Sequence, residues 1–502
     1  MARLHTMTRS PISNLQSLWI LGAASLALYA ATFVLPFPLW RWVDRAPALS
    51  WAELAHYRPA AGVGLALAWV ALFGLYWQAV LVAQAQLWSA VRAPVITWTV
   101  LSGLLLAVGA YPGGAIDIYT YVAHTRLFLA GLNPFLVPPD TAAATANLAP
   151  FLGEWHALTS PYGPLWELLA LGAGWLGRGG LWQEVVAFKL WNLAALLALL
   201  APLSAALRTR VPRYQAAGCV LVAWNPLLLV EVAANGHNDS WMLLAFTGAI
   251  WAWAGRRWWA LLPLLVAGAA MKWVPAIVAP LFLGDQLRVP RGRRVLPLGV
   301  LLATGVLLAS LLPFWTAAGD LRRWAISSES ERVGFSWQAL FLLAADWIRP
   351  GRGVPPSLFE LTRLAGYSLF GLAFLYSGRR LAQHRWSLPV AGFWVLVTYL
   401  SLGAPAFRPW YTLWVLPPAA LAIEGRLSQR AAGLTLGTAL ATVLYGFAWP
   451  WLGAHAALWL HLVGVPLSLG GAWLPDRIIA AARGRANFPA NDLFGEPPAD
   501  SV

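Results

Sequence analysis

The sequence is poor in cysteine and in charged residues. Its 502 residues include one cysteine, and charged residues make up 11% of the chain, against about 25% in soluble domains. A single cysteine, Cys219, excludes a disulfide within the chain and a metal cluster held by cysteines. Because hydrophobic residues reach 59%, the composition indicates a polytopic membrane protein rather than a soluble domain.

Several motifs that would identify a catalytic class are also missing. The chain contains no Gly-x-Ser-x-Gly nucleophile motif, no Gly-x-x-x-x-Gly-Lys phosphate loop and no His-Glu-x-x-His metal motif. The net charge of +14 does not indicate nucleic acid, because the arginines lie mainly in short loops between apolar runs, as the positive-inside rule describes. We therefore expect no nucleic-acid partner.

Apolar runs near the roughly 20 residues needed to cross a bilayer predict membrane spans along most of the chain. The expected spans lie at about 15–37, 61–83, 94–111, 184–206, 214–232, 239–255, 295–314, 357–376, 387–403, 409–423, 431–450 and 455–474. The predicted fold is all-α, a polytopic transmembrane helical protein with about 12 to 14 membrane segments, forming one domain over residues 1–484. The polar, proline-containing segment 485–502 is expected to be a disordered cytoplasmic tail.

Two segments, 162–178 and 258–284, do not fit this pattern of simple spans. Basic loops such as 208–213 are expected in the cytoplasm, and counting crossings from an internal N-terminus places Asp117 outside. The count holds only if 162–178 does not cross fully, so we expect it to be re-entrant or to lie along the interface. We interpret 258–284 as two half-helices with Lys272 at their outer turn, facing an extracytoplasmic cavity. The alternative is one long tilted span in which Lys272 snorkels or is paired.

The most informative stretch is 111–135, where a Tyr-Pro-Gly-Gly turn ends an apolar run and a carboxylate, Asp117, opens an amphipathic helix. Helical spacing places three side chains on the face of Asp117, namely Tyr121, His124 and Phe128, and two on an adjacent face, Tyr119 and Arg126. This pattern indicates an acid held at the edge of the bilayer on an interfacial helix. The alternative is that Asp117 only caps the helix. The two largest loops, 113–162 and 315–356, both fall outside by the same count and are expected to carry interfacial helices.

Further polar groups follow the outer ends of other spans, so we expect them to converge with Asp117 on one cavity. They are Tyr162 in a Ser-Pro-Tyr-Gly-Pro run, then His237, Asn238 and Asp239, then Lys272, and finally Arg408, Trp410 and Tyr411. The cations Arg126, Lys272 and Arg408 suit a phosphate headgroup, and contact with ordinary lipid headgroups is the alternative. Capping alone would explain Asp239, whereas Glu231 inside the preceding apolar run has no such explanation.

A metal site is not expected. Such a site needs three or four convergent ligands, for which Asp117, His237 and Asp239 are the candidates, but no close ligand spacing supports it. We therefore predict no cofactor and disfavour a divalent metal.

The order of these motifs resembles that of integral-membrane glycosyltransferases of the GT-C fold. The motifs are Asp-Ile-Tyr-x-Tyr and Asn-Pro-Phe within 117–135, Ser-Pro-Tyr-Gly-Pro-Leu at 160–165, Asn-Pro-Leu-Leu-Leu and Gly-His-Asn-Asp within 225–239, Met-Lys-Trp at 271–273 and Arg-Pro-Trp-Tyr at 408–411. Within that fold they look most like the polyprenyl-phosphate-mannose-dependent α-mannosyltransferases of bacterial envelopes, such as the actinobacterial α-1,6-mannosyltransferases of lipomannan assembly. The resemblance covers residues 94–420, which would form most of the catalytic module.

The resemblance implies transfer of a sugar, mannose, from a polyprenyl-phosphate donor to a glycan or glycolipid acceptor at the extracytoplasmic membrane face. Asp117 would be the general base of a single inverting displacement, and a cation would meet the charge on the departing phosphate. The remaining candidates would bind substrate: Arg126, Lys272 or Arg408 the phosphate, His237 and Asp239 hydroxyls, and Tyr119, Tyr121 and Trp410 sugar faces or the polyprenol. Asp117 has no adjacent carboxylate, unlike the paired acids of some GT-C enzymes, which weakens a metal-dependent mechanism.

A transporter or flippase for a lipid-linked saccharide is the alternative function, because the same cations would bind its phosphate. Transporters more often show repeated halves and polar groups near the bilayer midplane. The polar groups here gather at the outer ends of spans, and the sequence shows no internal repeat, so the enzyme is the favoured prediction. The expected partners are the lipid-linked donor, the acceptor and membrane lipids.

Overall fold

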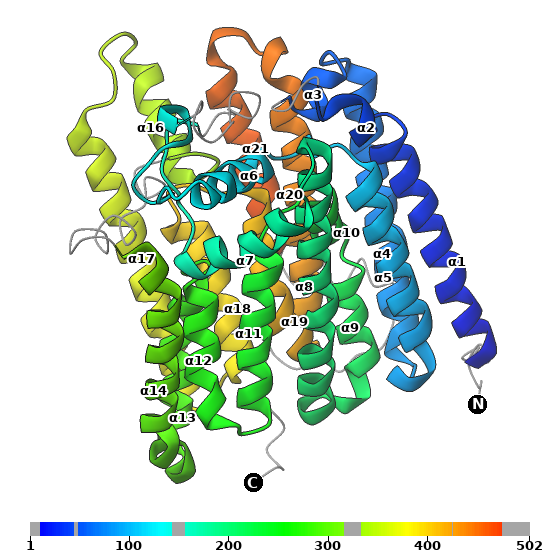
Figure 1. Cartoon of the computed structure of the whole chain (residues 1–502), viewed down its shortest axis with the longest axis vertical. Coiled ribbons are helices and arrows are strands. Elements are labelled where there is room, and N and C mark those ends of the chain that lie inside the picture. Colours follow the sequence, from blue (N-terminus) through cyan, green and yellow to red (C-terminus); the bar gives the residue numbers. More distant parts are fainter. Residues whose placement is uncertain (1–10, 45–48, 143–155, 316–332, 424, 474–502) are drawn as a thin grey trace, which may run out of the picture.

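The computed structural model describes residues 11–44, 49–142, 156–315, 333–423 and 425–473. These residues form helices that stand side by side in one bundle (Figure 1). The described part of the chain contains no strand, although isolated backbone bridges join Pro38 to Ala110 and Gly334 to Ala406. The prediction of an all-α polytopic membrane fold is confirmed.

Eight helices in the described ranges are long and apolar enough to cross a membrane. They are α1 (Pro11–Tyr29), α4 (Pro59–Gln84), α5 (Trp88–Gly109), α8 (Leu181–Arg210), α14 (Pro290–Leu311), α17 (Pro356–Ala382), α20 (Leu427–Ala448) and α21 (Ala456–Trp473). Short turns of π or 3₁₀ helix extend three of them: η1 (Ala30–Val34), η6 (Leu312–Phe314) and η10 (Trp449–Trp451). These helices fall on eight of the predicted spans.

A further predicted span, 214–232, is present as a bent pair of helices. Its first part is η4 (Pro212–Tyr214) with α9 (Gln215–Ala223), and its second part is α10 (Pro226–Leu229) with η5 (Val230–Ala234). The two parts meet at an angle of 47°. Asn225 explains the new start at α10, because its side-chain oxygen accepts the backbone N–H of Leu228 at 3.1 Å.

Three predicted spans form shorter or broken helices. Segment 239–255 is α11 (Asp239–Ala254), and 387–403 is α18 (Leu388–Thr398) followed by η8 (Tyr399–Gly403). A continuous helix over 409–423 is wrong, because this segment consists of η9 (Pro409–Val415) and the short α19 (Leu416–Leu421). Proline is the first residue of η9 and the second of α19, and it lacks the backbone N–H that an uninterrupted helix needs.

Neither irregular segment forms a single long spanning helix. Segment 162–178 forms α7 (Pro164–Leu176), whose 13 residues reach about 20 Å. This helix is too short for the hydrocarbon core, which is about 30 Å thick. Segment 258–284 forms α12 (Trp258–Ala269) and α13 (Val274–Arg288), with Lys272 in the turn between them, so one unbroken helix over this segment is excluded.

Short helices from several loops gather at one end of the bundle. In Figure 1, α3 (Trp51–Leu54), α6 (Asp117–Leu129) and α16 (Trp337–Ile348) lie toward the upper end, and α6 lies across the bundle. The remaining short elements are α2 (Leu39–Trp42), η2 (Pro139–Ala142) and η11 (Gly453–His455). The predicted tail 485–502 and the part 316–332 of the second loop lie outside the described residues.

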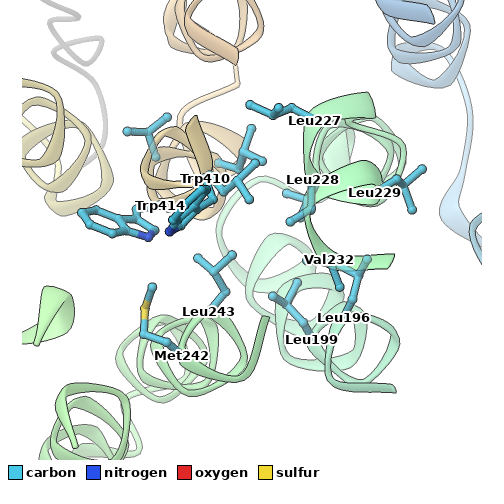
Figure 2. Close-up of a cluster of buried hydrophobic side chains, with 14 of the residues drawn as sticks. Leu196, Leu199, Leu227, Leu228, Leu229, Val232, Met242, Leu243, Trp410 and Trp414 are labelled. Atoms are coloured by element: carbon cyan, nitrogen blue, oxygen red, sulfur yellow. The ribbon is translucent and has the colours of Figure 1, made fainter. Parts of the chain in front are cut away.

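A buried apolar core fixes the helix ends that carry the polar motifs (Figure 2). Val232 of η5 lies close to Leu196 and Leu199 of α8, while Trp410 and Trp414 of η9 lie beside each other. In a membrane-spanning bundle such contacts stabilise the fold through van der Waals packing rather than removal of surface from water. The core therefore joins segments that are far apart in the sequence.

Candidate active site

Asp117 is the first residue of α6 and is largely buried, with 8% of its surface exposed. Ile116 occupies the N-cap position, and the Asp117 side chain makes its hydrogen bond to a tyrosine instead of to the helix backbone. The alternative interpretation of Asp117 as a helix cap is therefore wrong. Its place in the first turn still favours a carboxylate, because a helix N-terminus carries a partial positive charge.

Close backbone contacts hold the turn before Asp117. A Cβ atom at Gly113 would lie 2.3 Å from the ring of Trp51, and one at Gly114 would lie 2.5 Å from the side chain of Asn235. The backbone N–H of Gly114 donates to Asn235 Oδ1 at 3.1 Å. The two glycines thus let α3 and the end of η5 approach the segment that leads into Asp117.

Two side chains from distant segments approach the same oxygen of Asp117. The hydroxyl of Tyr162 donates to Oδ2 at 2.9 Å, and Nδ1 of His237 lies 3.7 Å from Oδ2. Burial, together with the negative charge of Asp117, raises the pKa of Tyr162 well above its usual range. The phenol therefore remains protonated and able to donate.

His237 is fully buried between two carboxylates. Its Nε2 lies 3.2 Å from Oε2 of Glu231, on the side of the ring opposite Asp117. The imidazole stacks on Trp410, with ring centroids 3.7 Å apart and planes at 28°. The structure therefore brings three of the sequence motifs together around one imidazole.

Lys272 forms a second polar cluster. Its Nζ donates to Oδ2 of Asp239 at 2.6 Å and to Oδ1 of Asn238 at 3.2 Å. Asp239 is fully buried and also accepts a hydrogen bond from Trp414 Nε1 at 2.7 Å. The interpretation of Asp239 as a helix cap is wrong, because Asn238 occupies that position and the Asp239 carboxylate is engaged by these two donors.

The turn that carries Lys272 is tied to the segment of Tyr162. The backbone N–H of Gly163 donates to the carbonyl of Met271 at 3.0 Å. Lys272 Nζ lies 6.0 Å from the ring centroid of Tyr162 and 5.9 Å from that of Tyr411. The two polar clusters are therefore neighbours, joined through Tyr162.

A cavity of about 470 Å³ lies beside Asp117, and its size is within the range of about 300–1,000 Å³ typical of small-molecule sites. Three carboxylates line it, those of Asp117, Glu231 and Glu53, and Arg408 is the cation among the described lining residues. Its aromatic lining consists of Trp51, Trp69, Phe335, Phe407, Trp410, Tyr445 and Phe447. Lys272 does not line this cavity, contrary to the expectation that it would face it.

His124 and Arg126 lie further along α6 and engage other carboxylates. Nδ1 of His124 lies 3.5 Å from Oε1 of Glu167. The guanidinium of Arg126 makes two bonds to Glu184, at 3.0 and 2.6 Å. The structure does not bring these two predicted site residues to the Asp117 cluster.

Tyr119 and Tyr121 are buried within the protein. The ring of Tyr121 lies 5.0 Å from that of Tyr162 and 4.9 Å from that of Trp166, measured between centroids. Tyr411 likewise stacks on a neighbour, Trp414, at 4.4 Å. These three tyrosines do not line the cavity beside Asp117, contrary to the expectation that they would converge with Asp117 on one cavity.

Glu53, which lines the cavity from α3, is not among the residues predicted from the sequence. Its carboxylate accepts from the backbone N–H and the hydroxyl of Ser50, at 2.7 and 2.8 Å, in a capping box. The Ser-x-x-Glu spacing is a readable signal for that cap. No local signal identifies Glu167 and Glu184, because their partners lie far away in the sequence.

The described residues contain no group of three or more His, Cys, Asp or Glu side chains arranged to hold a metal ion. The three candidate ligands have other partners: Asp117 contacts Tyr162, His237 lies beside Glu231, and Asp239 binds Lys272.

The molecule is thus an all-helical, multi-pass membrane protein with a carboxylate-lined cavity built from helix ends and short loop helices. More than half of the chain, residues 19–287, matches a family model described as the N-terminal domain of α-(1→6)-mannopyranosyltransferase. The chain belongs to this family. The matched region contains Asp117, Tyr162, His237 and Lys272, but ends before Arg408.

Individual relatives agree with this assignment. One, from Mycolicibacterium smegmatis and named "Probable alpha-(1->6)-mannopyranosyltransferase", is 28% identical over 373 residues, which cover 64% of this chain and 63% of that protein. The alpha-(1->6)-mannopyranosyltransferase A of Mycobacterium tuberculosis is 27% identical over 359 residues, covering 68% of this chain and 67% of that protein. The alpha-(1->6)-mannopyranosyltransferase B of Corynebacterium glutamicum is 25% identical over 344 residues, covering 61% of this chain and 55% of that protein. The chain therefore matches between 55% and 67% of the length of these relatives.

Proposed function

We propose that this protein transfers mannose from a polyprenyl-phosphate donor to a hydroxyl of a glycan or glycolipid acceptor. The main support is that Asp117 and Arg408 line one cavity in a chain of the α-(1→6)-mannopyranosyltransferase family. A (1→6) linkage would make the attacking group the primary hydroxyl at carbon 6 of the acceptor sugar. One cavity would then present a base to that hydroxyl and a cation to the phosphate.

In this proposal Asp117 is the general base of an inverting displacement. The acceptor oxygen forms a bond to the anomeric carbon as the bond from that carbon to the phosphate oxygen breaks. The electron pair leaves with polyprenyl phosphate, and the hydroxyl proton passes to Asp117. Tyr162 and His237 both approach Oδ2, which favours Oδ1 as the oxygen that receives the proton. Inversion to an α linkage requires a β-linked donor.

The charges of the cavity suggest how the donor lies. A guanidinium pairs well with phosphate, so Arg408 would bind the phosphate of the donor and stabilise the charge on the leaving group. The carboxylates Asp117 and Glu53 would repel a phosphate but accept hydrogen bonds from sugar hydroxyls. The mannose would therefore lie between Arg408 and the carboxylates.

The apolar part of the cavity supports a lipid-linked donor. Leu65 and Trp69 of α4 and Ala439 and Val443 of α20 also line the cavity. Such a surface suits the first isoprene units of a polyprenol, whereas a water-soluble sugar nucleotide would gain little from it. Substrate would then enter from the bilayer.

The arrangement of α8 supports an extracytoplasmic site. Glu184, near the start of this helix, binds Arg126 of α6, while the basic residues Arg208 and Arg210 end the helix. A helix of 30 residues is about 45 Å long, so the basic end lies far from α6. With the basic end in the cytoplasm, the positive-inside rule places Asp117 outside.

The proposal is tested with the purified full-length protein, polyprenyl-phosphate-[¹⁴C]mannose and an α-mannoside acceptor. We expect a glycosidic product and a loss of about 10²- to 10⁴-fold in kcat for Asp117→Asn with unchanged expression. The matched control is Asp285→Asn, since Asp285 binds Trp253 on α11 at 2.7 Å and does not line the cavity. Full activity of the Asp117→Asn variant would exclude Asp117 as the general base. Movement of the donor across a liposome membrane without product would favour a flippase.

A further inference from the structure

We propose that Glu231 is a positioning residue, which acts through His237 to hold the carboxylate of Asp117 in place. This inference rests on the proposed function, in which Asp117 is the base. Glu231 has no role in the reaction as described so far, although it is buried in an apolar helix and its carboxylate faces the same cavity. A buried carboxylate needs polar partners. One of the side chains beside Glu231 is His237, which also lies beside Asp117.

The backbone around Glu231 departs from an ordinary helix. Residues Val230–Ala234 form a turn of π-helix, in which the backbone N–H of Asn235 donates to the carbonyl of Val230 at 2.9 Å. Such turns insert one extra residue and occur often at functional sites. Asn235 also donates from Nδ2 to Oε2 of Glu231 at 2.9 Å, so the end of the π turn holds the carboxylate.

Gly236, which follows this turn, gives the backbone the conformation that places His237 against Glu231. Gly236 has a φ of +78°, a conformation that favours glycine, and Asn192 of α8 donates to its carbonyl at 2.6 Å. A Cβ atom on Gly236 would lie 2.4 Å from the side chain of Ile118. The backbone N–H of His237 in turn donates to the carbonyl of Glu231 at 2.9 Å. The chain thus folds back so that His237 lies against Glu231.

The imidazole spans the distance between two cavity carboxylates. Nε2 is 3.2 Å from Oε2 of Glu231 and Nδ1 is 3.7 Å from Oδ2 of Asp117. Neither nitrogen makes a hydrogen bond within the described part of the chain, so these two carboxylates are the acidic groups that the imidazole faces. Stacking on Trp410 restricts rotation of the ring. Glu231 can therefore influence Asp117 through a ring that has little freedom to move. Contacts of this length commonly shorten when substrate fills a site.

A positioning residue has a recognisable kinetic signature. Glu231→Gln removes the charge but keeps the shape, and we expect kcat to fall by about 10- to 100-fold with KM for donor and acceptor unchanged. Glu231→Asp keeps the charge on a shorter side chain and should retain more activity than Glu231→Gln. A merely structural role for Glu231 would lower the melting temperature without this order of activities.

A double-mutant cycle tests the path through His237. His237→Asn keeps a polar atom near the position of Nδ1 but has none near Nε2, so it should disconnect Glu231 from Asp117. We expect Glu231→Gln to cause no further loss of kcat in the His237→Asn background. Multiplied losses in the double variant, or a raised KM with normal kcat in Glu231→Gln, would overturn the proposal.

The outcomes separate this inference from the proposed function. An inactive Asp117→Asn together with a fully active Glu231→Gln refutes the positioning role alone. An active Asp117→Asn refutes the base itself. Melting temperatures of all variants, measured beside Asp285→Asn, identify losses that come from misfolding. If Glu231→Gln does not fold, kcat is compared instead for Glu231→Asp, His237→Asn and their double variant. Multiplied losses in that double variant would likewise overturn the proposal.

Discussion

Removing the charge of Lys272 should destabilise the protein, because it leaves a buried carboxylate without its cation. Asp239 has no exposed surface, and its Oδ2 lies 2.6 Å from Lys272 Nζ. Breaking a buried pair on one side typically costs about 3–5 kcal/mol, since the remaining charge stays buried. For Lys272→Met we therefore expect the melting temperature in detergent, followed by tryptophan fluorescence, to fall on the order of 5 °C.

The double variant Lys272→Met/Asp239→Asn should recover most of this loss. The amide of Asn carries no charge, and its oxygen can still accept the hydrogen bond that Trp414 donates to Oδ1 of Asp239. A wild-type melting temperature for Lys272→Met, or a double variant no more stable than the single one, would refute the reasoning. Activity of the stable double variant then shows whether Lys272 also binds substrate.

Two further predictions concern the packing of α20 on α21 and the phosphate site. A Cβ atom at Gly471 would lie 2.2 Å from the backbone of Gly433, whereas nothing lies within 4 Å of one at Gly470. In thermal unfolding, Gly471→Ala should therefore cost about 1–3 kcal/mol and Gly470→Ala almost nothing, and equal melting temperatures would contradict this packing. Arg408→Gln should lower kcat/KM for the lipid-linked donor by about 100-fold with unchanged stability; an unchanged value would remove Arg408 from the phosphate site.

Most membrane helices could be predicted from the sequence because spanning is a local property. Roughly 20 consecutive apolar residues must bury their backbone hydrogen bonds within one helix, whatever the rest of the chain does. The same local reasoning identified the short α7 and the break at Lys272. It was wrong for 409–423, where the prolines prevent one continuous helix but do not lower the hydrophobicity of the segment.

The contacts of the site could be predicted only in part. The outer ends of spans were sufficient to group Asp117, Tyr162 and His237, which the structure joins. The ion pairs could not be predicted in this way. Arg126 and Glu184, for example, are 58 residues apart and no local pattern links them. The cavity also draws on Trp69 and Tyr445, outside the segment whose motifs resemble the family, so its apolar wall had no sequence signal.

The three cations expected at the phosphate differ in whether they line the cavity that contains Asp117. Arg126 is held by Glu184 and Lys272 by Asp239, so much of the charge of each is already balanced by a carboxylate at 2.6 Å. A phosphate would have to compete with these pairs, and in a buried site breaking one leaves an anion uncompensated. Arg408 differs because it lines the cavity that contains Asp117. Substitutions of Arg126 and Lys272 should therefore act mainly on stability, whereas substitution of Arg408 should act on the kinetics of the donor.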